Sequence, residues 1–216
     1  MKKIMMTLLA LCMMLTMVAC GVQGTASSQT TVTTQTGSDA SAEMELLDEN
    51  VTYFADIEIA DYGTITVQLD QSAAPITAAN FVSLAKSGFY DGLTFHRIIS
   101  GFMMQGGDPK GNGTGGSDVK IKGEFAANGH KNPISHERGV ISMARSKAYD
   151  SASSQFFIMH VDYTGLDGQY AAFGRVTEGL NVVDAVCAAA KPTDNNGSIA
   201  KDQQPVIKSI SIHAAH

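Results

Sequence analysis

Hydrophobic and polar residues alternate strictly at the start of the region that begins near Val51. In 55–59 three apolar residues are separated by two acidic ones, and 65–69 repeats the pattern with threonine and glutamine. Because successive side chains of a strand point to opposite faces, this period of two predicts two half-buried strands. The Asp-Tyr-Gly sequence at 61–63 predicts a turn that joins them into a hairpin.

The apolar spacing changes twice to the period of a helix. Pro75 suits a first helical position, Phe81 and Leu84 fall on one face, and Gly88 is placed to end that helix. A second, short apolar helix is predicted over 180–186. Many short strands with two helices are typical of an antiparallel barrel, which removes exposed sheet edges by closing. Further strands are predicted at 95–99, 102–106, 139–143, 156–159, 171–176 and 206–212.

The first residues have a different character. Two lysines precede an apolar run over 4–18, which is shorter than a typical membrane span and matches a signal sequence. The run ends in Met-Val-Ala-Cys at 17–20, which resembles a bacterial lipoprotein signal that leaves Cys20 as the lipidated N-terminus. A plain secretory signal cut near the same place is the alternative. Lipid on Cys20 would anchor the protein on the outer face of the cytoplasmic membrane.

The segment that follows predicts a linker. Residues 23–36 are nearly all Gly, Thr, Ser, Gln and Ala, a composition that buries too little apolar surface to offset chain entropy. The sequence therefore divides into a signal peptide over 1–19, a lipidated N-terminus with a flexible linker over 20–50, and one domain over 51–216. The linker would hold the domain away from the membrane.

Charge and composition exclude several classes of function. Removal of the signal leaves 13 basic and 21 acidic residues, a net charge of −8, which disfavours nucleic acid as a partner. The histidines lack the spacing of a zinc site, so no metal is expected, and His130 and His136 are expected on a surface loop. The Gly-x-Gly-x-x-Gly sequence at 111–116 lacks the preceding strand and following helix of a dinucleotide site. Cys187 lies in an apolar run and is expected in the core.

One stretch, 95–109, places a cation among residues that favour burial. It reads FHRIISGFMMQGGDP, with Arg97 surrounded by apolar side chains and Gln105 available to hold its guanidinium. A cation beside apolar surface suits work on a neutral polar group in a dry cleft. A buried strand pair whose arginine merely extends to solvent is equally consistent with these residues alone.

Three segments together resemble the cyclophilin family of peptidyl-prolyl cis-trans isomerases. They read FHRII.GFM.QGGDP, SQFFI and LDG....FG, and the resemblance extends from about Phe54 to the C-terminus. It implies a mainly β fold, a closed eight-stranded antiparallel barrel with a helix capping each end. It also implies a monomeric domain without cofactors, whose substrates are proline-containing unfolded or flexible polypeptides.

The resemblance also implies roles for individual residues. Arg97, Phe102 and Gln105 would be catalytic, and the substrate-binding residues would be Met103, Ala144, Arg145, Ser146, Gln155, Phe157, Leu166 and Tyr170. Arg145 and Tyr170 stand where many relatives carry asparagine and histidine. Gly165 stands where cyclosporin-sensitive members carry tryptophan, which implies weak cyclosporin binding.

Rotation about an X-Pro bond needs no reactive group. The barrier of roughly 18–20 kcal/mol comes from amide resonance, so it suffices to bind the twisted state better than either planar isomer. Arg97 would donate to the imide nitrogen as that nitrogen leaves conjugation. The sequence therefore predicts an isomerase that assists the folding of exported proteins. The alternatives are a non-catalytic proline-peptide-binding chaperone or scaffold on the same fold, and a structural surface protein.

Overall fold

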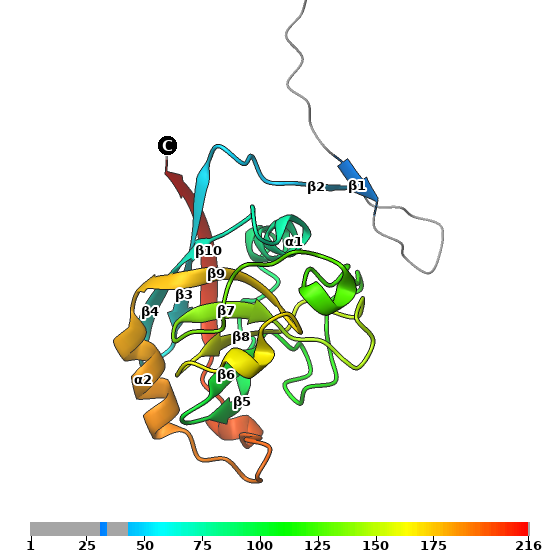
Figure 1. The fold of residues 1–216 in the computed structure, drawn as a ribbon. Helices are drawn as coiled ribbons and strands as arrows, with labels where there is room; N and C mark the ends of the chain where they lie inside the picture. Colours follow the sequence, from blue (N-terminus) through cyan, green and yellow to red (C-terminus); the bar gives the residue numbers. More distant parts are fainter. Residues whose placement is uncertain (1–30, 34–42, 216) are drawn as a thin grey trace, which may run out of the picture.

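The computed structural model describes residues 31–33 and 43–215 of the 216-residue chain. The predicted signal peptide and Cys20 lie outside these residues. Within the segment predicted as a linker, β1 (Thr31–Thr33) and β2 (Glu43–Glu45) form a two-stranded antiparallel sheet that lies to one side of the main body (Figure 1). In the described part of the chain, no helix has both the length and the apolar character needed to cross a membrane.

The main body is one antiparallel sheet of eight strands in the described residues. Its strand order is β10-β3-β4-β9-β7-β8-β6-β5. The strands are β3 (Thr52–Ile59), β4 (Gly63–Leu69), β5 (Phe95–Ile99), β6 (Met103–Gly106), β7 (Val140–Met143), β8 (Phe156–Met159), β9 (Ala171–Glu178) and β10 (Ile207–Ala215). The predicted hairpin is β3 paired with β4, and the residues at its predicted inner positions are buried.

The sheet curls so that its two end strands approach each other. β5 and β10 are linked by the isolated bridge between Thr94 and Val206, and the Phe95 N–H donates to the Pro205 carbonyl at 2.9 Å. The predicted eight-stranded antiparallel fold is confirmed. Its closure is looser than expected, because one isolated bridge and a few main-chain hydrogen bonds around it, rather than a strand ladder, join the ends and leave a half-barrel.

Two helices cover the open ends of the curled sheet (Figure 1). They are α1 (Pro75–Lys86) and α2 (Leu180–Ala189). Both helices begin at the residue that the apolar spacing predicts, and α2 extends three residues beyond its predicted end. Short 3₁₀ turns, Ala126–Asn128, Thr164–Leu166 and Lys201–Gln203, lie in the loops.

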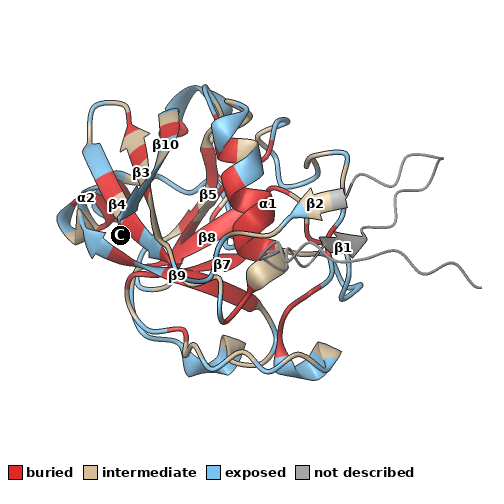
Figure 2. Cartoon of the chain, turned by 90° about the horizontal axis from the view of Figure 1, so that it is seen from above, coloured by how far each residue is buried: buried red, intermediate tan, exposed pale blue. Residues whose placement is uncertain are grey.

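The core fills the space between α1 and the concave side of the sheet (Figure 2). Its centre is a cluster of fully buried aromatic rings in edge-on or tilted contact, with centroid separations of 5.2–5.9 Å, formed by Phe81, Tyr90, Phe95, Phe156 and Phe173. Such contacts add to the stabilisation from the buried area of each ring. Cys187 is buried in the core as predicted.

Candidate active site

The pairing of β5, β6 and β8 brings the central polar residue of the site beside its neighbours. Arg97 on β5 is the register partner of Gln105 on β6, and Gln105 is in turn the partner of Phe157 on β8. Directly opposed residues of adjacent strands project from the same face of a sheet. These three side chains therefore share the convex face, while the neighbouring Phe156 enters the core.

A small apolar cluster separate from the main core lies on this convex face. Met103 and Phe157 are two of its buried members, and Phe102, Leu166 and Tyr170 are among the residues that pack against it. The Tyr170 ring meets Phe157 edge-on at 5.7 Å between centroids. The cluster forms one end of a cavity of about 820 Å³, a volume typical of ligand pockets. We call the part lined by these five residues the apolar end.

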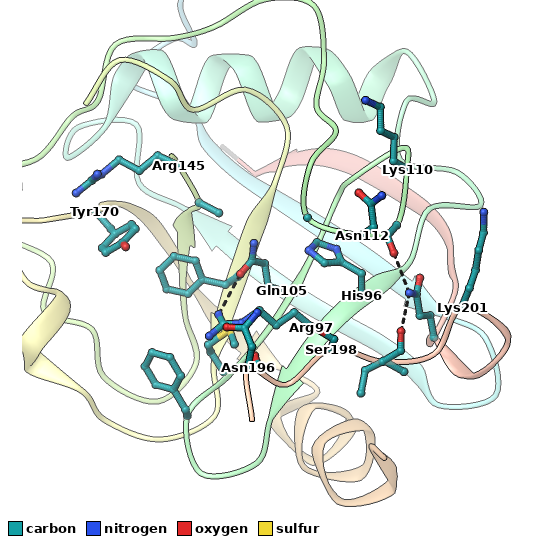
Figure 3. Close-up of a pocket in the computed structure, with 18 of the residues that line it drawn as sticks. His96, Arg97, Gln105, Lys110, Asn112, Arg145, Tyr170, Asn196, Ser198 and Lys201 are labelled. Atoms are coloured by element: carbon teal, nitrogen blue, oxygen red, sulfur yellow. Dashed lines mark hydrogen bonds between the residues drawn. The ribbon is translucent and has the colours of Figure 1, made fainter. Parts of the chain in front are cut away.

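Arg97 lies beside the apolar end and is held from two sides (Figure 3). Its Nε donates to the main-chain carbonyl of Asn196 at 2.7 Å, and its Nη1 donates to Oε1 of Gln105 at 3.2 Å. Within the described residues, its Nη2 donates to no protein acceptor. Burial lowers the pKa of Arg97, with Tyr170 acting in the opposite direction, but a guanidinium stays charged at working pH. The site thus presents a fixed cation with a donor available to a ligand.

Gln105 is itself held by a relay of amides. Its Nε2 donates to Oε1 of Gln155 at 2.9 Å, and the Nε2 of Gln155 donates to the Gly115 carbonyl at 2.7 Å. The relay fixes the orientation of the Gln105 amide, which then presents its oxygen to Arg97. The Arg97 guanidinium is in this way held in position before a substrate binds, so that little reorganisation is needed during the reaction.

The structure brings together most of the residues that the sequence predicts for the site. The cavity is lined by Arg97, Phe102, Met103, Gln105, Ala144, Arg145, Phe157, Leu166 and Tyr170. Gln155 reaches the site through Gln105. Ser146 is exposed outside the cavity lining, and its hydroxyl bonds that of Ser151 at 2.8 Å.

Arg145 has a role that the sequence does not reveal. Its guanidinium lies over the rings of Phe125, Tyr149 and Tyr170 at 4.7–5.1 Å from their centroids. It also donates to the main-chain carbonyl of Gln169. Arg145 therefore holds Tyr170 against the rim of the cavity. Phe125 and Tyr170 are 20 or more residues away from Arg145 in the sequence.

Sequence reasoning missed the residues that line the rest of the cavity. Besides the predicted residues, the lining includes His96, Lys110, Gly111, Asn112, Gly113, Asn196, Ser198, Ile199, Lys201 and Gln204. Most belong to two loops, 110–113 and 196–204, which carry no periodic pattern. Tyr163 was also missed: its ring meets Phe102 edge-on at 5.1 Å, and a side-chain carbon added at Gly165 would lie 2.9 Å from it.

His136 is fully buried, so the expectation of a surface histidine is wrong. Its Nδ1 lies 2.9 Å from Asp167 Oδ1, its Nε2 lies 3.0 Å from Ser142 Oγ, and its ring stacks on Phe157. The order of these groups is that of a serine hydrolase triad. However, Ser142 has no exposed surface, so its hydroxyl cannot reach a substrate. The set instead holds Phe157 from behind.

Acidification is expected to destabilise the protein from about pH 6.5 downward. Burial lowers the pKa of His96 and of His136, against the raising effect of Asp108 and Asp167 respectively. Below the ordinary histidine pKa of about 6.5, the unfolded chain therefore binds protons that the folded chain does not. The free energy of unfolding should fall as pH decreases.

Urea unfolding between pH 8 and pH 5 measures this dependence. A His136→Gln variant should lose part of it, because one of the two buried imidazoles is gone. An unfolding free energy that stays constant over this range would contradict the account.

Comparisons with known proteins agree with this geometry. Residues 54–215 match the family model described as "Cyclophilin type peptidyl-prolyl cis-trans isomerase/CLD". A peptidyl-prolyl cis-trans isomerase of Helicobacter pylori strain J99 is 49% identical over 126 residues, which cover 57% of this chain and 75% of the relative. Peptidyl-prolyl cis-trans isomerase B of Bacillus subtilis is 49% identical over 122 residues, covering 56% and 82%.

A solved structure shows the same fold. The crystal structure of a cyclophilin-type isomerase of Cryptosporidium parvum, determined in the presence of the dipeptide Ala-Pro, superposes with a TM-score of 0.66 at 31% identity. The match covers 75% of this chain and 99% of that one. With the family model matching most of the chain, the protein belongs to the cyclophilin-type peptidyl-prolyl cis-trans isomerases and has their activity.

Proposed function

We propose that this isomerase accelerates X-Pro rotation in the cavity beside Arg97 and assists the folding of exported proteins. The observation that carries the proposal is the held guanidinium of Arg97 next to the apolar end. A proline ring would fill the apolar end, where Phe102, Met103, Phe157 and Leu166 surround it. That placement brings the imide nitrogen close to the cation.

The proposed mechanism stabilises the twisted state alone. In a planar X-Pro bond the nitrogen lone pair is delocalised into the carbonyl and accepts a hydrogen bond poorly. As the bond twists, the lone pair returns to the nitrogen. The hydrogen bond that Arg97 donates to this nitrogen is therefore stronger in the twisted state than in either planar isomer. Exclusion of water by the apolar end increases the strength of this interaction. No covalent bond forms or breaks at any step.

The substrate class follows from the shape of the cavity. It opens to solvent along the convex face, so a flexible or unfolded segment of chain can enter while a packed proline cannot. The Ala-Pro dipeptide named for the Cryptosporidium relative supports a proline-containing ligand. A non-catalytic holdase on the same fold would bind such peptides without increasing their isomerisation rate, which a peptide assay separates.

Export and anchoring are the second part of the proposal. The lysines at 2–3, the apolar run over 4–18 and the small residues before Cys20 support export with lipid on the cysteine. The composition of 21–50 supports a tether between that lipid and the domain. The isomerase would then act on chains emerging at the outer face of the cytoplasmic membrane.

Replacing Cys20 with serine is expected to abolish lipid attachment. Cells that express the full chain are grown with a labelled fatty acid, and the label on the purified protein is measured. The wild type should carry the label and Cys20→Ser should carry none, because the thiol that accepts the lipid is missing. Cys187→Ala is the matched control and should keep the label, since Cys187 is buried in the domain. Absence of label on the wild type would overturn the anchoring proposal.

A further inference from the structure

The charges that line the cavity are all of one sign. Arg97, Lys110, Arg145 and Lys201 line it, and among the described residues no aspartate or glutamate does. The chain as a whole carries a net charge of −6, so the charge of the cavity lining is opposite in sign to that of the whole chain. A cavity lined by one sign of charge concentrates ligands of the opposite sign.

The two lysines differ from the two arginines in that no hydrogen bond to a described residue holds their charged groups. Arg97 and Arg145 are held by main-chain carbonyls, whereas Lys110 and Lys201 form no ion pair with any described residue within 4 Å. Both lysines lie at the end of the cavity opposite Arg145 and Tyr170 (Figure 3). Their ammonium groups are therefore available to a ligand.

A buried histidine without partners lies at the same end. His96 is only 5% exposed, lines the cavity, and neither of its ring nitrogens has a hydrogen-bond partner. Buried polar atoms without a partner are rare and call for an explanation. The main chain of Gly113 lies close to the ring, since an added side-chain carbon there would be 3.6 Å from Nε2. Because both ring nitrogens are buried, a ligand group reaches the imidazole only after a local shift of the groups that cover it.

The loops that carry these groups are fixed in place. The buried carboxylate of Asp108 accepts hydrogen bonds from the main-chain N–H groups of Lys110, Asn112 and Gly113 at 2.6–3.1 Å. Gln204 donates to the carbonyls of both Gly111 and Ile199 at 2.9 Å and joins the two loops. The polar end, which we define as His96, Lys110, Asn112, Lys201 and Gln204, is thus formed before any ligand binds.

We propose that the polar end is a subsite for an acidic side chain of the substrate, within about three residues of the proline. The inference rests on the proposed placement of proline at the apolar end. Three extended residues span roughly 10 Å, which is the scale of a cavity of this size. The exposed amide of Asn112 can donate to a carboxylate, and the two lysines supply opposite charge.

The test compares peptides that differ only in charge. Each position from three before to three after proline carries glutamate or the isosteric glutamine in turn, and kcat/KM is measured with the full-length protein at low salt. At one position the wild type should prefer glutamate by about three- to tenfold, the range for a few solvent-exposed charge contacts. The preference should decrease as ionic strength rises.

A double variant and its matched control locate the effect. Lys110→Gln with Lys201→Gln should reduce the glutamate-to-glutamine ratio to about one. Lys86→Gln with Lys131→Gln removes the same charge from exposed sites outside the cavity and should keep the ratio. A ratio near one at every position in the wild type, or an equal loss in both double variants, would overturn the subsite.

These outcomes separate the subsite from the function on which it rests. If the glutamine peptides are isomerised without any preference for glutamate, only the subsite fails. If no peptide of the series is isomerised by the wild type, the proposed placement of the reaction in this cavity fails as well.

Discussion

Replacing Arg97 with alanine is expected to lower kcat/KM for a proline-containing peptide by about tenfold or more while the protein stays folded. The substitution removes the donor proposed to act on the twisted imide, and loss of one such held donor commonly costs a factor of this size or larger. Arg97 is half-buried and lies outside the main core, so its removal leaves the packing of the barrel unchanged. A protease-coupled assay of peptide isomerisation measures the effect.

Two further variants make this result specific. Arg97→Lys keeps the charge but loses the planar fork that reaches both Asn196 and Gln105, so it should recover only part of the rate. Arg175→Ala removes an exposed arginine paired with Glu137 and should leave the rate unchanged. Wild-type turnover in Arg97→Ala would refute the catalytic assignment.

Replacing Phe156 with alanine is expected to lower the free energy of unfolding by about 3–5 kcal/mol. The ring has no exposed surface and meets Phe81, Tyr90 and Phe95 edge-on at 5.5–5.9 Å between centroids. Its loss leaves a cavity at the centre of the aromatic cluster. The midpoint of thermal unfolding should fall by on the order of 10 °C. Unchanged thermal and urea midpoints would show that the cluster does not stabilise the barrel.

Replacing the neighbouring Phe157 is expected to affect activity, in contrast to the effect of Phe156 on stability. Phe157 projects to the opposite face of β8 and lines the cavity, so Phe157→Ala should lower kcat/KM even when the protein is measured well below its unfolding temperature. Phe156→Ala keeps that wall, and its folded fraction should retain most of the activity. The pair tests whether adjacent positions of one strand divide stability from function.

Local patterns predict the elements of this fold well. The alternation at 55–59 and 65–69 is the β3–β4 hairpin, and the apolar spacing that follows Pro75 is α1. Each signal is contained within one segment, because burial against the core repeats with the period of the element. The sequence does not show how the sheet ends meet, since the bridge between Thr94 and Val206 joins residues far apart in the chain.

Some residues of the site could likewise be predicted from the sequence and others could not. Arg97, Gln105 and Phe157 could be identified because they occur in long family motifs. The polar end could not, because its residues come from loops whose relative position depends on contacts such as those of Gln204. His136 was misplaced for a related reason: its polar neighbours suggest a surface loop, whereas Asp167 and Ser142 satisfy both ring nitrogens inside the protein.

The central claim is that the cavity beside Arg97 binds the twisted X-Pro state more tightly than either planar isomer. Exchange NMR on one proline peptide, with wild type and Arg97→Ala, gives the isomerisation rate of bound peptide and its Kd from the same samples. The account predicts a rate at least about tenfold lower in the variant, with a much smaller change in Kd. An equal rate in the two proteins at saturating peptide would contradict it.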